Sequence, residues 1–347
     1  MANAKKHKDR EINSQPENRP IFASVILFGG TIALFLALGA SVSLGASEID
    51  FKTVWSAIFQ FNSELTSHQI IQEVRLPRAI SGALVGAFLA VSGALLQGIT
   101  RNPLAAPSIM GITDGAAFAL AIVFSFFPTT GYSMIMFWAF LGAGLGTILV
   151  FGIGALAKGG LTPVKLALAG IAVGALLSSL ASGIAIYNQV AQNMSFWYAG
   201  GLVGTQWISI KLLLPVGIIG LGIAFILAHS ITVLNLGEDV AKGLGQRTFF
   251  VKGLAIIVVM LLTGASVSVA GAIGFIGLVI PHITRFLVGT DYRWVIPCAS
   301  ILGAILLVLA DIGARMLNPP FETPVGAITA VIGVPFFLYL ARKGGNA

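Results

Sequence analysis

The chain has 347 residues, of which 56% are hydrophobic and only 10% are charged, and its mean hydropathy is +0.94. An average soluble domain is far less apolar, so this composition excludes one and predicts an all-α polytopic membrane protein. The formal net charge is +7, and the charged residues form short islands between long apolar runs.

The first 20 residues, MANAKKHKDREINSQPENRP, form a polar tail. The apolar run that follows is too long for a cleavable signal, so we expect a retained first span and a single membrane domain over 21–347. Because a helix needs roughly 20 apolar residues to cross the hydrocarbon core, the apolar windows predict about ten spans. They are 21–44, 79–97, 105–127, 133–156, 166–187, 212–229, 254–270, 274–288, 295–313 and 325–340.

The basic residues predict the orientation of these spans. An even number of spans puts both termini on one side, and the basic tail together with Arg342 and Lys343 places that side in the cytoplasm. Of the 20 basic residues, five then lie outside, namely Lys52, Arg75, Arg78, Lys211 and Arg315.

Arg75 and Arg78, in the stretch QEVRLPRA, stand at the outer mouth of the second span, against the usual charge bias. The residues alone leave two interpretations open. Both side chains can extend to lipid headgroup phosphates. Alternatively, they can receive carboxylates from a partner, because the guanidinium fork binds a carboxylate in bidentate fashion.

Glycine spacing predicts how the spans pack. The chain has 42 glycines, and several lie four residues apart, as in Gly82 and Gly86, Gly142 and Gly146, and Gly170 and Gly174. Small residues at this spacing let helix backbones approach closely in lipid. Segment 90–96, AVSGALL, also resembles segment 268–274, SVAGAIG, in a span of opposite direction, as an inverted repeat would.

Two acids lie within or at the edges of the apolar spans, where ionisable groups usually have a function. Asp311 has Arg315 four residues later, so the spacing predicts an ion pair at the outer end of the ninth span. Asp114 lies in NPLAAPSIMGITDGAA, which predicts an interrupted helix start with Asp114 capping its backbone N–H groups. A proton relay is the alternative for Asp114. The single cysteine, Cys298, is interpreted as a small buried hydrophobe.

The longest predicted inside loop is 230–252, SITVLNLGEDVAKGLGQRTFFVK. Leu236, Val240 and Leu244 recur every four residues, which predicts a short amphipathic helix with one apolar edge. That edge would contact lipid headgroups or a protein partner, and Glu238 and Asp239 beside the edge favour the protein.

Catalytic motifs are missing from the sequence. It contains no HExxH, no GxSxG and no P-loop, and His282 in IPHITR is interpreted as structural. We therefore expect no catalytic residue, no cofactor, no resident metal and no ATP hydrolysis by this chain.

Several motifs occur in one order along the chain: VRLPRAISGALVGAFLAVSGALLQGITRNPLAAPSIMGITDGAA, LALAGIAVGALLSS, FWYAGGLVGTQW, LGEDVAKGLG, VAGAIGFIGLVIPHITR, LADIGARM and ETPVGAITAVIGVPFFLYLARK. From about residue 48 to its end, the chain thereby resembles the FecCD family of ABC-importer permeases. The resemblance implies ten spans in the type II importer fold and a dimer of identical or related permeases in a bacterial cell membrane. It also implies two cytoplasmic ATPase subunits, an extracytoplasmic binding protein and no nucleic-acid partner.

The resemblance assigns residues as well. Arg75 and Arg78 of the family's RLPR motif, and Arg315 ending its ADxxAR motif, look like the arginines that receive glutamates of the binding protein. A second group looks like the coupling helix that enters a cleft on the ATPase, namely Gly237, Glu238, Ala241, Leu244 and Gly245. Segment 158–165, KGGLTPVK, corresponds to the cytoplasmic gate, and the fifth span would line the pathway through residues that stay unidentified. Asp114 departs from the family, where this position is usually polar but uncharged.

For function, the resemblance implies import of a ferric siderophore, for example a hydroxamate such as ferrichrome. Transport would proceed by alternating access, driven by ATP hydrolysis on a separate subunit. Cobalamin or haem import is the alternative within the family. An ion-driven carrier or an intramembrane enzyme is a third hypothesis, which the coupling loop, the outer arginines and the missing catalytic motifs disfavour.

Overall fold

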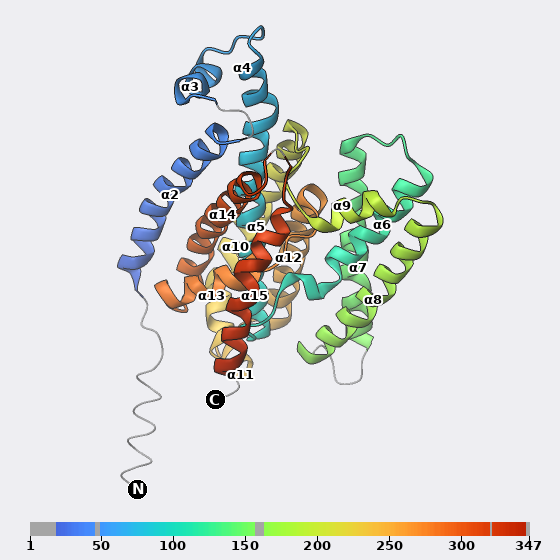
Figure 1. Ribbon diagram of the computed structural model, residues 1–347. Coiled ribbons are helices and arrows are strands. Elements are labelled where there is room, and N and C mark those ends of the chain that lie inside the picture. Colours follow the sequence, from blue (N-terminus) through green and yellow to red (C-terminus); the bar gives the residue numbers. More distant parts are fainter. Residues whose placement is uncertain (1–18, 46–48, 157–162, 320, 345–347) are drawn as a thin grey trace.

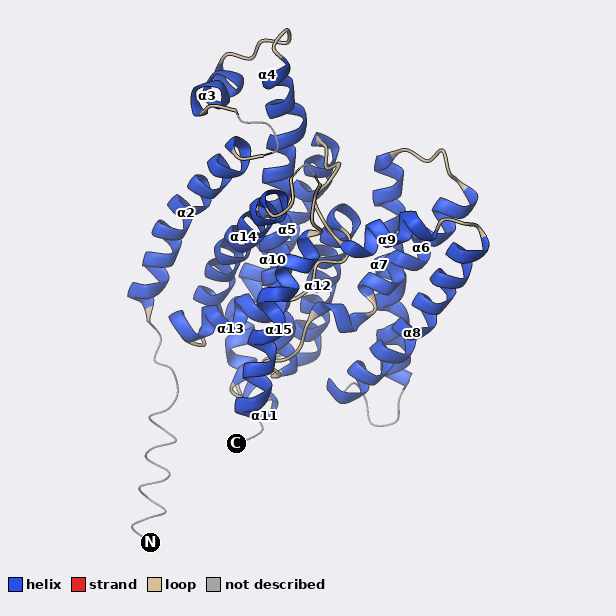
Figure 2. Ribbon diagram, in the orientation of Figure 1, coloured by secondary structure: helices blue, strands red, loops and turns tan. Residues whose placement is uncertain are grey.

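The computed structural model describes residues 19–45, 49–156, 163–319 and 321–344, and in these ranges every regular element is a helix (Figure 2). The predicted all-α fold is confirmed. Each predicted span has its helix: α2 (Pro20–Ser43), α5 (Leu76–Thr100), α6 (Ile112–Phe126), α7 (Tyr132–Leu156), α8 (Pro163–Tyr187), α10 (Trp207–Asn235), α12 (Thr248–Ala270), α13 (Ile276–Val288), α14 (Tyr292–Met316) and α15 (Val325–Gly344). The polar tail, except residues 19 and 20, and most of the expected gate segment 158–165 lie outside the described residues.

The apolar helices differ in length. Seven are long and apolar enough to cross a membrane, while α6, α13 and the apolar part of α15 (Val325–Leu340) are shorter. At 1.5 Å per residue, the 13 residues of α13 extend about 20 Å, less than the roughly 30 Å of a hydrocarbon core. The number ten therefore counts apolar helices and not complete crossings.

Short helices connect the apolar ones, namely α3 (Phe51–Phe59), α4 (Thr66–Ile70), the π-helical turn η1 (Ile71–Arg75), the 3-10 turn η2 (Pro107–Met110), α9 (Ala191–Ala199) and α11 (Glu238–Gly243). The second span begins earlier than predicted, because α4, η1 and α5 form one continuous helical segment, Thr66–Thr100. The π turn ends two residues before Pro77, and the Leu76 N–H bonds to the Ile71 carbonyl. Because Pro77 has no backbone N–H, it cannot continue the regular hydrogen-bond pattern of the helix, and a π turn is a local adjustment to such a missing donor.

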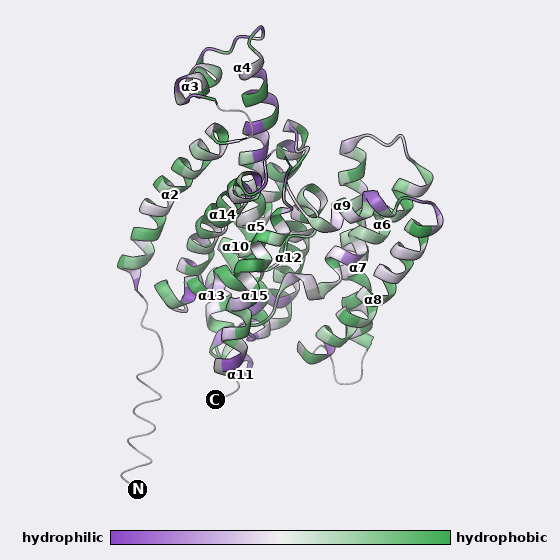
Figure 3. Ribbon diagram, viewed as in Figure 1, coloured by the Kyte–Doolittle hydropathy of each residue, from purple (hydrophilic) through white to green (hydrophobic). Residues whose placement is uncertain are grey.

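Helix α5 forms the centre of the bundle (Figure 1). It packs against α10, α12, α13 and α14, while α6, α7 and α8 form a group of their own that meets α12 through α7 and, to a smaller extent, through α6. Of the apolar window of α5, 83% is buried, against 11% for α2 at the periphery. Figure 3 shows hydrophobic residues along the helices and hydrophilic ones gathered where α4 meets α5 and around α11.

Glycines mark the closest helix contacts. Gly86 of α5 faces Gly303 of α14, and Gly115 of α6 faces Gly142 of α7. A Cβ atom on any of these four residues would overlap a backbone carbonyl of the opposite helix. The predicted role of the glycine spacing is thus confirmed for α5 and α7, where the helices touch through their backbones.

Two breaks interrupt the apolar helices, at residues 101–111 between α5 and α6 and at 271–275 between α12 and α13. The chain turns at Arg101 and Phe275, which have positive φ angles of 51° and 67°. The buried Gln97 Nε2 donates to the carbonyls of Ala105 and Gly277, each at 3.2 Å. One amide therefore binds the backbone of the first break and of the first turn of α13, where Pro281 cannot donate to the Gly277 carbonyl.

Basic residues that were predicted to lie outside gather at one end of the bundle. Arg75 and Arg315 both bind the carboxyl end of α2. Lys211 lies in the first turns of α10, where Trp207 Nε1 donates to the Gln72 carbonyl at 2.9 Å. Helices α3 and α4 lie at this end, and α11 lies at the opposite end (Figure 1).

The Gly86–Gly303 contact yields a prediction. Gly303→Ala places a methyl group against the Gly86 carbonyl and should lower the thermal unfolding temperature of the purified protein, since overpacking costs about 1–3 kcal/mol. The matched control is Gly313→Ala in the same helix, where nothing lies within 4 Å of the added carbon. The control should leave the unfolding temperature unchanged or raise it, and equal effects of the two variants would contradict the close contact.

Candidate functional sites at the two ends of the bundle

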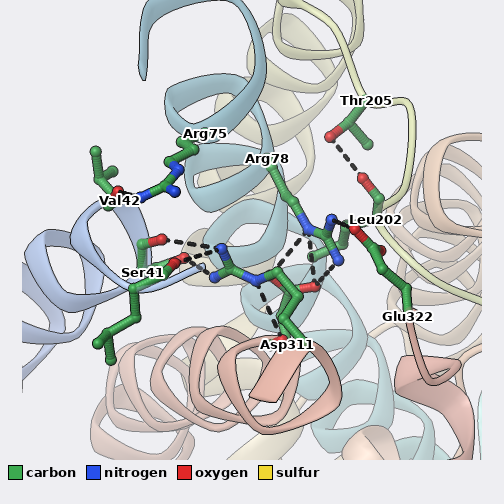
Figure 4. A network of polar contacts seen from close by, with 10 residues as sticks. Ser41, Val42, Arg75, Arg78, Leu202, Thr205, Asp311 and Glu322 are labelled. Carbon is green, nitrogen blue, oxygen red and sulfur yellow. Dashed lines mark hydrogen bonds and ion pairs between the residues drawn. The ribbon is translucent and has the colours of Figure 1, made fainter. Parts of the chain in front are cut away.

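The carboxyl end of α2 gathers two of the arginines predicted for docking (Figure 4). Arg75 Nη1 donates to the carbonyls of Val42 and Ser43, at 2.8 and 2.7 Å. Arg315 Nη1 donates to the carbonyl of Ser41 at 3.1 Å. The last carbonyls of a helix lack intrahelical partners and carry its negative dipole end. Arg75 and Arg315 therefore stabilise the end of α2.

Asp311 forms ion pairs with both Arg78 and Arg315, and Figure 4 shows the first of them. Arg78 Nη2 donates to Asp311 Oδ1 at 2.8 Å, and Arg78 Nε lies 3.1 Å from both carboxylate oxygens. Arg315 Nε forms the predicted ion pair within α14, 3.2 Å from Asp311 Oδ2. The carboxylate is only 1% exposed, and its burial is offset by two guanidinium partners with good geometry.

Glu322 completes this group, with Oε1 2.8 Å from Arg78 Nη1. Its side chain is 37% exposed, whereas Arg75 and Arg78 are 5% and 6% exposed. The three predicted docking arginines are thus brought together, but they are engaged within the chain and are not displayed on its surface. We call these five residues the outer network: Arg75, Arg78, Arg315, Asp311 and Glu322.

Sequence reasoning did not find the contacts of Arg78. Asp311 and Glu322 follow it by 233 and 244 residues, and no local periodicity connects positions so far apart. The three arginines and two carboxylates leave a formal charge of +1. An acidic partner group would therefore meet a net positive charge here, although a smaller one than the arginines alone suggest.

Helices α3 and α4 form a cap beside the outer network. Val54 and Ala57 of α3 pack against Val42, Ile71 and Ala79 in a small apolar core. Trp55 and Phe59, on the other side of α3, are exposed and stack on each other with ring centroids 4.5 Å apart. The short α3 was not predicted, because it is too short for a membrane span.

At the opposite end, α11 forms the short amphipathic helix that was predicted. It lies between Gly237 and Gly245, whose φ angles of 129° and 80° favour glycine. The predicted loop 230–252 is too long, because α10 continues to Asn235 and α12 already begins at Thr248. No glycine or proline interrupts α10 between Ala228 and Asn235, so the helix continues past the predicted boundary.

The faces of α11 differ in burial. Ala241 is fully buried against the bundle, while Leu236, Val240 and Leu244 are exposed and form the predicted apolar edge. Glu238 Oε2 lies 2.6 Å from Lys252 Nζ in α12, and Oε1 lies 3.2 Å from Lys242 Nζ. Hydrogen bonds from these two lysines lower the pKa of Glu238 to about 2. Glu238 therefore stays ionised above that pH and connects α11 to α12.

Three further predicted residues lie apart from both ends. Asp114 is the third residue of α6 and packs against Gly174 of α8, where an added Cβ atom would lie 2.7 Å from Asp114 Oδ2. Cys298 is fully buried, as predicted for a small hydrophobe. His282 packs against Phe336, with ring centroids 5.6 Å apart. Among the residues that the structure describes, no group of three or more metal-ligating side chains is close enough to hold a metal ion.

Known proteins similar to this chain are named as permeases or transporters of iron or metal chelates. The iron(3+)-hydroxamate import system permease protein FhuB of Bacillus subtilis (strain 168) is 58% identical over 94% of this chain and 85% of the relative. The iron-uptake system permease protein FeuB of the same strain is 46% identical over 93% of this chain and 97% of the relative. A solved ABC transporter of the metal-chelate type, in an inward-facing conformation, superposes with a TM-score of 0.80 and 30% identity, covering 92% of this chain and 99% of that chain.

The family assignment rests on a match to most of the chain. The model of the FecCD transport family matches residues 32–343, which include both the outer network and α11. The chain belongs to the FecCD transport family.

Proposed function

We propose that this chain is the membrane-spanning permease subunit of an ABC importer for ferric hydroxamate siderophores. The observation that carries this proposal is the 58% identity, over nearly the whole chain, to a permease named for iron(3+)-hydroxamate import. Cobalamin or haem import stays the alternative within the family. An ion-driven carrier or an intramembrane enzyme has no support from the named relatives, and ATP would be hydrolysed by separate subunits.

The arrangement of the helices favours a passage between two permease copies, identical or related. Helix α8, the predicted pathway helix, has only 33% of its apolar window buried, and Leu168, Ile171 and Leu176 are exposed. A second permease placed against this face would enclose a route with apolar walls. The end with α11 and both chain termini would face the bacterial cytoplasm, and the outer network would face outward.

An uptake assay tests the substrate. In a strain lacking its own hydroxamate permease, this chain, expressed with its ATPase and binding protein, should restore uptake of radiolabelled ferric hydroxamate. Uptake of labelled cobalamin and haem should stay at the level of the empty vector. Restored cobalamin uptake without ferric hydroxamate uptake would overturn the substrate assignment.

The outer network is proposed as the docking surface for the binding protein. Its supporting features are its net positive charge, its position at the outer end and the partial exposure of Glu322. A glutamate of the partner could replace Glu322 on Arg78 without exposing Asp311, because Asp311 holds a different edge of the guanidinium. Docking would then exchange one carboxylate for another.

Docking on the outer network, with this exchange at Arg78, makes predictions about affinity. Arg75→Gln should weaken binding of the binding protein to the permease complex in nanodiscs by about tenfold, since it removes a charged hydrogen-bond donor. Glu322→Gln should tighten binding, because it removes a competing carboxylate. The control Lys211→Gln removes an exposed charge at the same end and should change affinity less than twofold.

Surface plasmon resonance measures these affinities, and thermal unfolding of each variant checks that the permease is folded. Unchanged affinity in folded Arg75→Gln would reject docking on Arg75. Weaker binding in Glu322→Gln would reject the exchange of carboxylates.

Helix α11 is proposed as the coupling helix that contacts the ATPase. The exposed Val240 and Leu244 would enter an apolar cleft of that subunit, while Gly237 and Gly245 set the turns and Ala241 and Glu238 hold α11 on the bundle. Burying two such side chains gives several kcal/mol at about 25 cal/mol per Å² of apolar area.

We predict that Leu244→Asp reduces co-purification of the ATPase at least tenfold, because a charge would enter the apolar cleft. Leu317→Asp is the matched control, since Leu317 is equally exposed but follows α14 at the opposite end. The control should keep the ATPase bound. Normal ATPase binding and substrate-stimulated ATP turnover in Leu244→Asp would contradict the assignment of α11.

A further inference from the structure

A cavity of about 410 Å³ opens between the ends of α5, α10 and α13 and the start of α14, at the α11 end of the molecule. Its lining includes Arg101, Arg285, Gln97, Asn235 and Thr290. The lining residues include two arginines and no carboxylate. A cavity of this size is in the range of sites that bind small ligands.

Arg285 is positioned toward this cavity by a neighbour. Its Nη2 donates to Gln97 Oε1 at 2.6 Å, and the amide nitrogen of Gln97 is occupied by the backbone carbonyls of Ala105 and Gly277. The Gln97 amide is therefore oriented with its oxygen toward Arg285. The second terminal nitrogen of the Arg285 guanidinium, Nη1, is buried and has no hydrogen-bond partner in the part of the chain that the structure describes. A buried guanidinium nitrogen without an acceptor is unfavourable, so a small turn of the Arg285 side chain that brings Nη1 to an anion in the adjoining cavity would satisfy it.

Arginines near the carboxyl ends of helices can simply compensate the negative ends of the helix dipoles. That role accounts for Arg101, which directly follows α5. It does not account for Arg285, because a compensating side chain would direct its donors to the free carbonyls, whereas Nη1 has no acceptor. Asn235 and Thr290 add neutral donors around the same space. This combination of two cations and neutral donors suits the several oxygens of a phosphate group.

We propose that this cavity binds a phosphate group of net negative charge, held by Arg285 and Arg101. Two sources share this chemistry: the headgroup of an anionic phospholipid, which basic pockets between helices bind at the cytoplasmic membrane surface, and a free phosphate. The cavity is lined by Leu236, which directly precedes the coupling segment at Gly237. An anion bound here would therefore contact the base of α11, and this site is independent of which substrate the permease carries.

Binding can be measured on the purified permease–ATPase complex by the shift of its thermal unfolding temperature. One titration uses inorganic phosphate, a second uses short-chain phosphatidylglycerol, and a third uses short-chain phosphatidylcholine, whose headgroup has no net charge. Sodium chloride at equal ionic strength corrects for screening. The wild-type complex should be stabilised by phosphate, phosphatidylglycerol or both, and more strongly than by phosphatidylcholine.

Two variants test the arginines. Arg285→Gln and Arg101→Gln should each raise the concentration for half-maximal stabilisation about tenfold, as expected for the loss of one charged hydrogen bond. Arg101→Gln leaves the Gln97 contact intact and keeps the test valid if Arg285→Gln does not fold. The matched control is Arg247→Gln, an exposed arginine at the same end that does not line the cavity, and it should change this concentration less than twofold.

The outcomes separate the sources. If the variants raise the half-maximal concentration for phosphatidylglycerol alone, the bound group is a lipid headgroup. If they raise it for inorganic phosphate, the bound group is a free phosphate. Equal titrations of Arg101→Gln and the wild type, or no stabilisation by either probe, would overturn the proposal. Loss of ATPase binding in Arg101→Gln without any effect of the probes would also overturn it, because the cavity would then belong to the interface with a protein partner.

Discussion

Backbone carbonyls that the helices leave unpaired are the constraint on which this structure depends. Inside a membrane protein such groups cannot bond to water, so a side chain must reach them. Gln97 does this in the first helix break and in the first turn of α13, and Arg75 and Arg315 do it at the end of α2. The scarce polar side chains of this apolar chain are therefore placed where a helix ends or is interrupted.

Helix α5 shows how this constraint and close packing combine on one element. Arg75 directly precedes its first turn, Gly86 meets α14 in its middle, and Gln97 lies in its last turns. With 25 residues at 1.5 Å each, α5 is about 38 Å long and connects the two ends of the bundle. The outer network and the phosphate cavity are thus supported by the same buried helix.

Local signals in the sequence were sufficient for much of the fold. Apolar windows gave an approximate position for every apolar helix, and the spacing of Leu236, Val240 and Leu244 predicted α11. Helix ends were harder, because α10 continues to Asn235 without a glycine or proline that would mark its end, and α12 already begins at Thr248 although Lys252 and Gly253 suggested a later start. The Asp311–Arg315 pair was predictable from its spacing, but the bond of Arg78 to the same carboxylate depends on how α5 and α14 pack.

The backbone contact of Gly86 with Gly303, and that of Gly115 with Gly142, leave no side chains between the helices that could repack. Sliding α5 along α14, or α6 along α7, would bring carbonyls into collision with neighbouring residues that carry a Cβ. Each pair should therefore move as one rigid body. Relative motion is easier where α7 meets α12 through side chains, such as Phe140 against Gly264, and this seam would act as the hinge of the molecule.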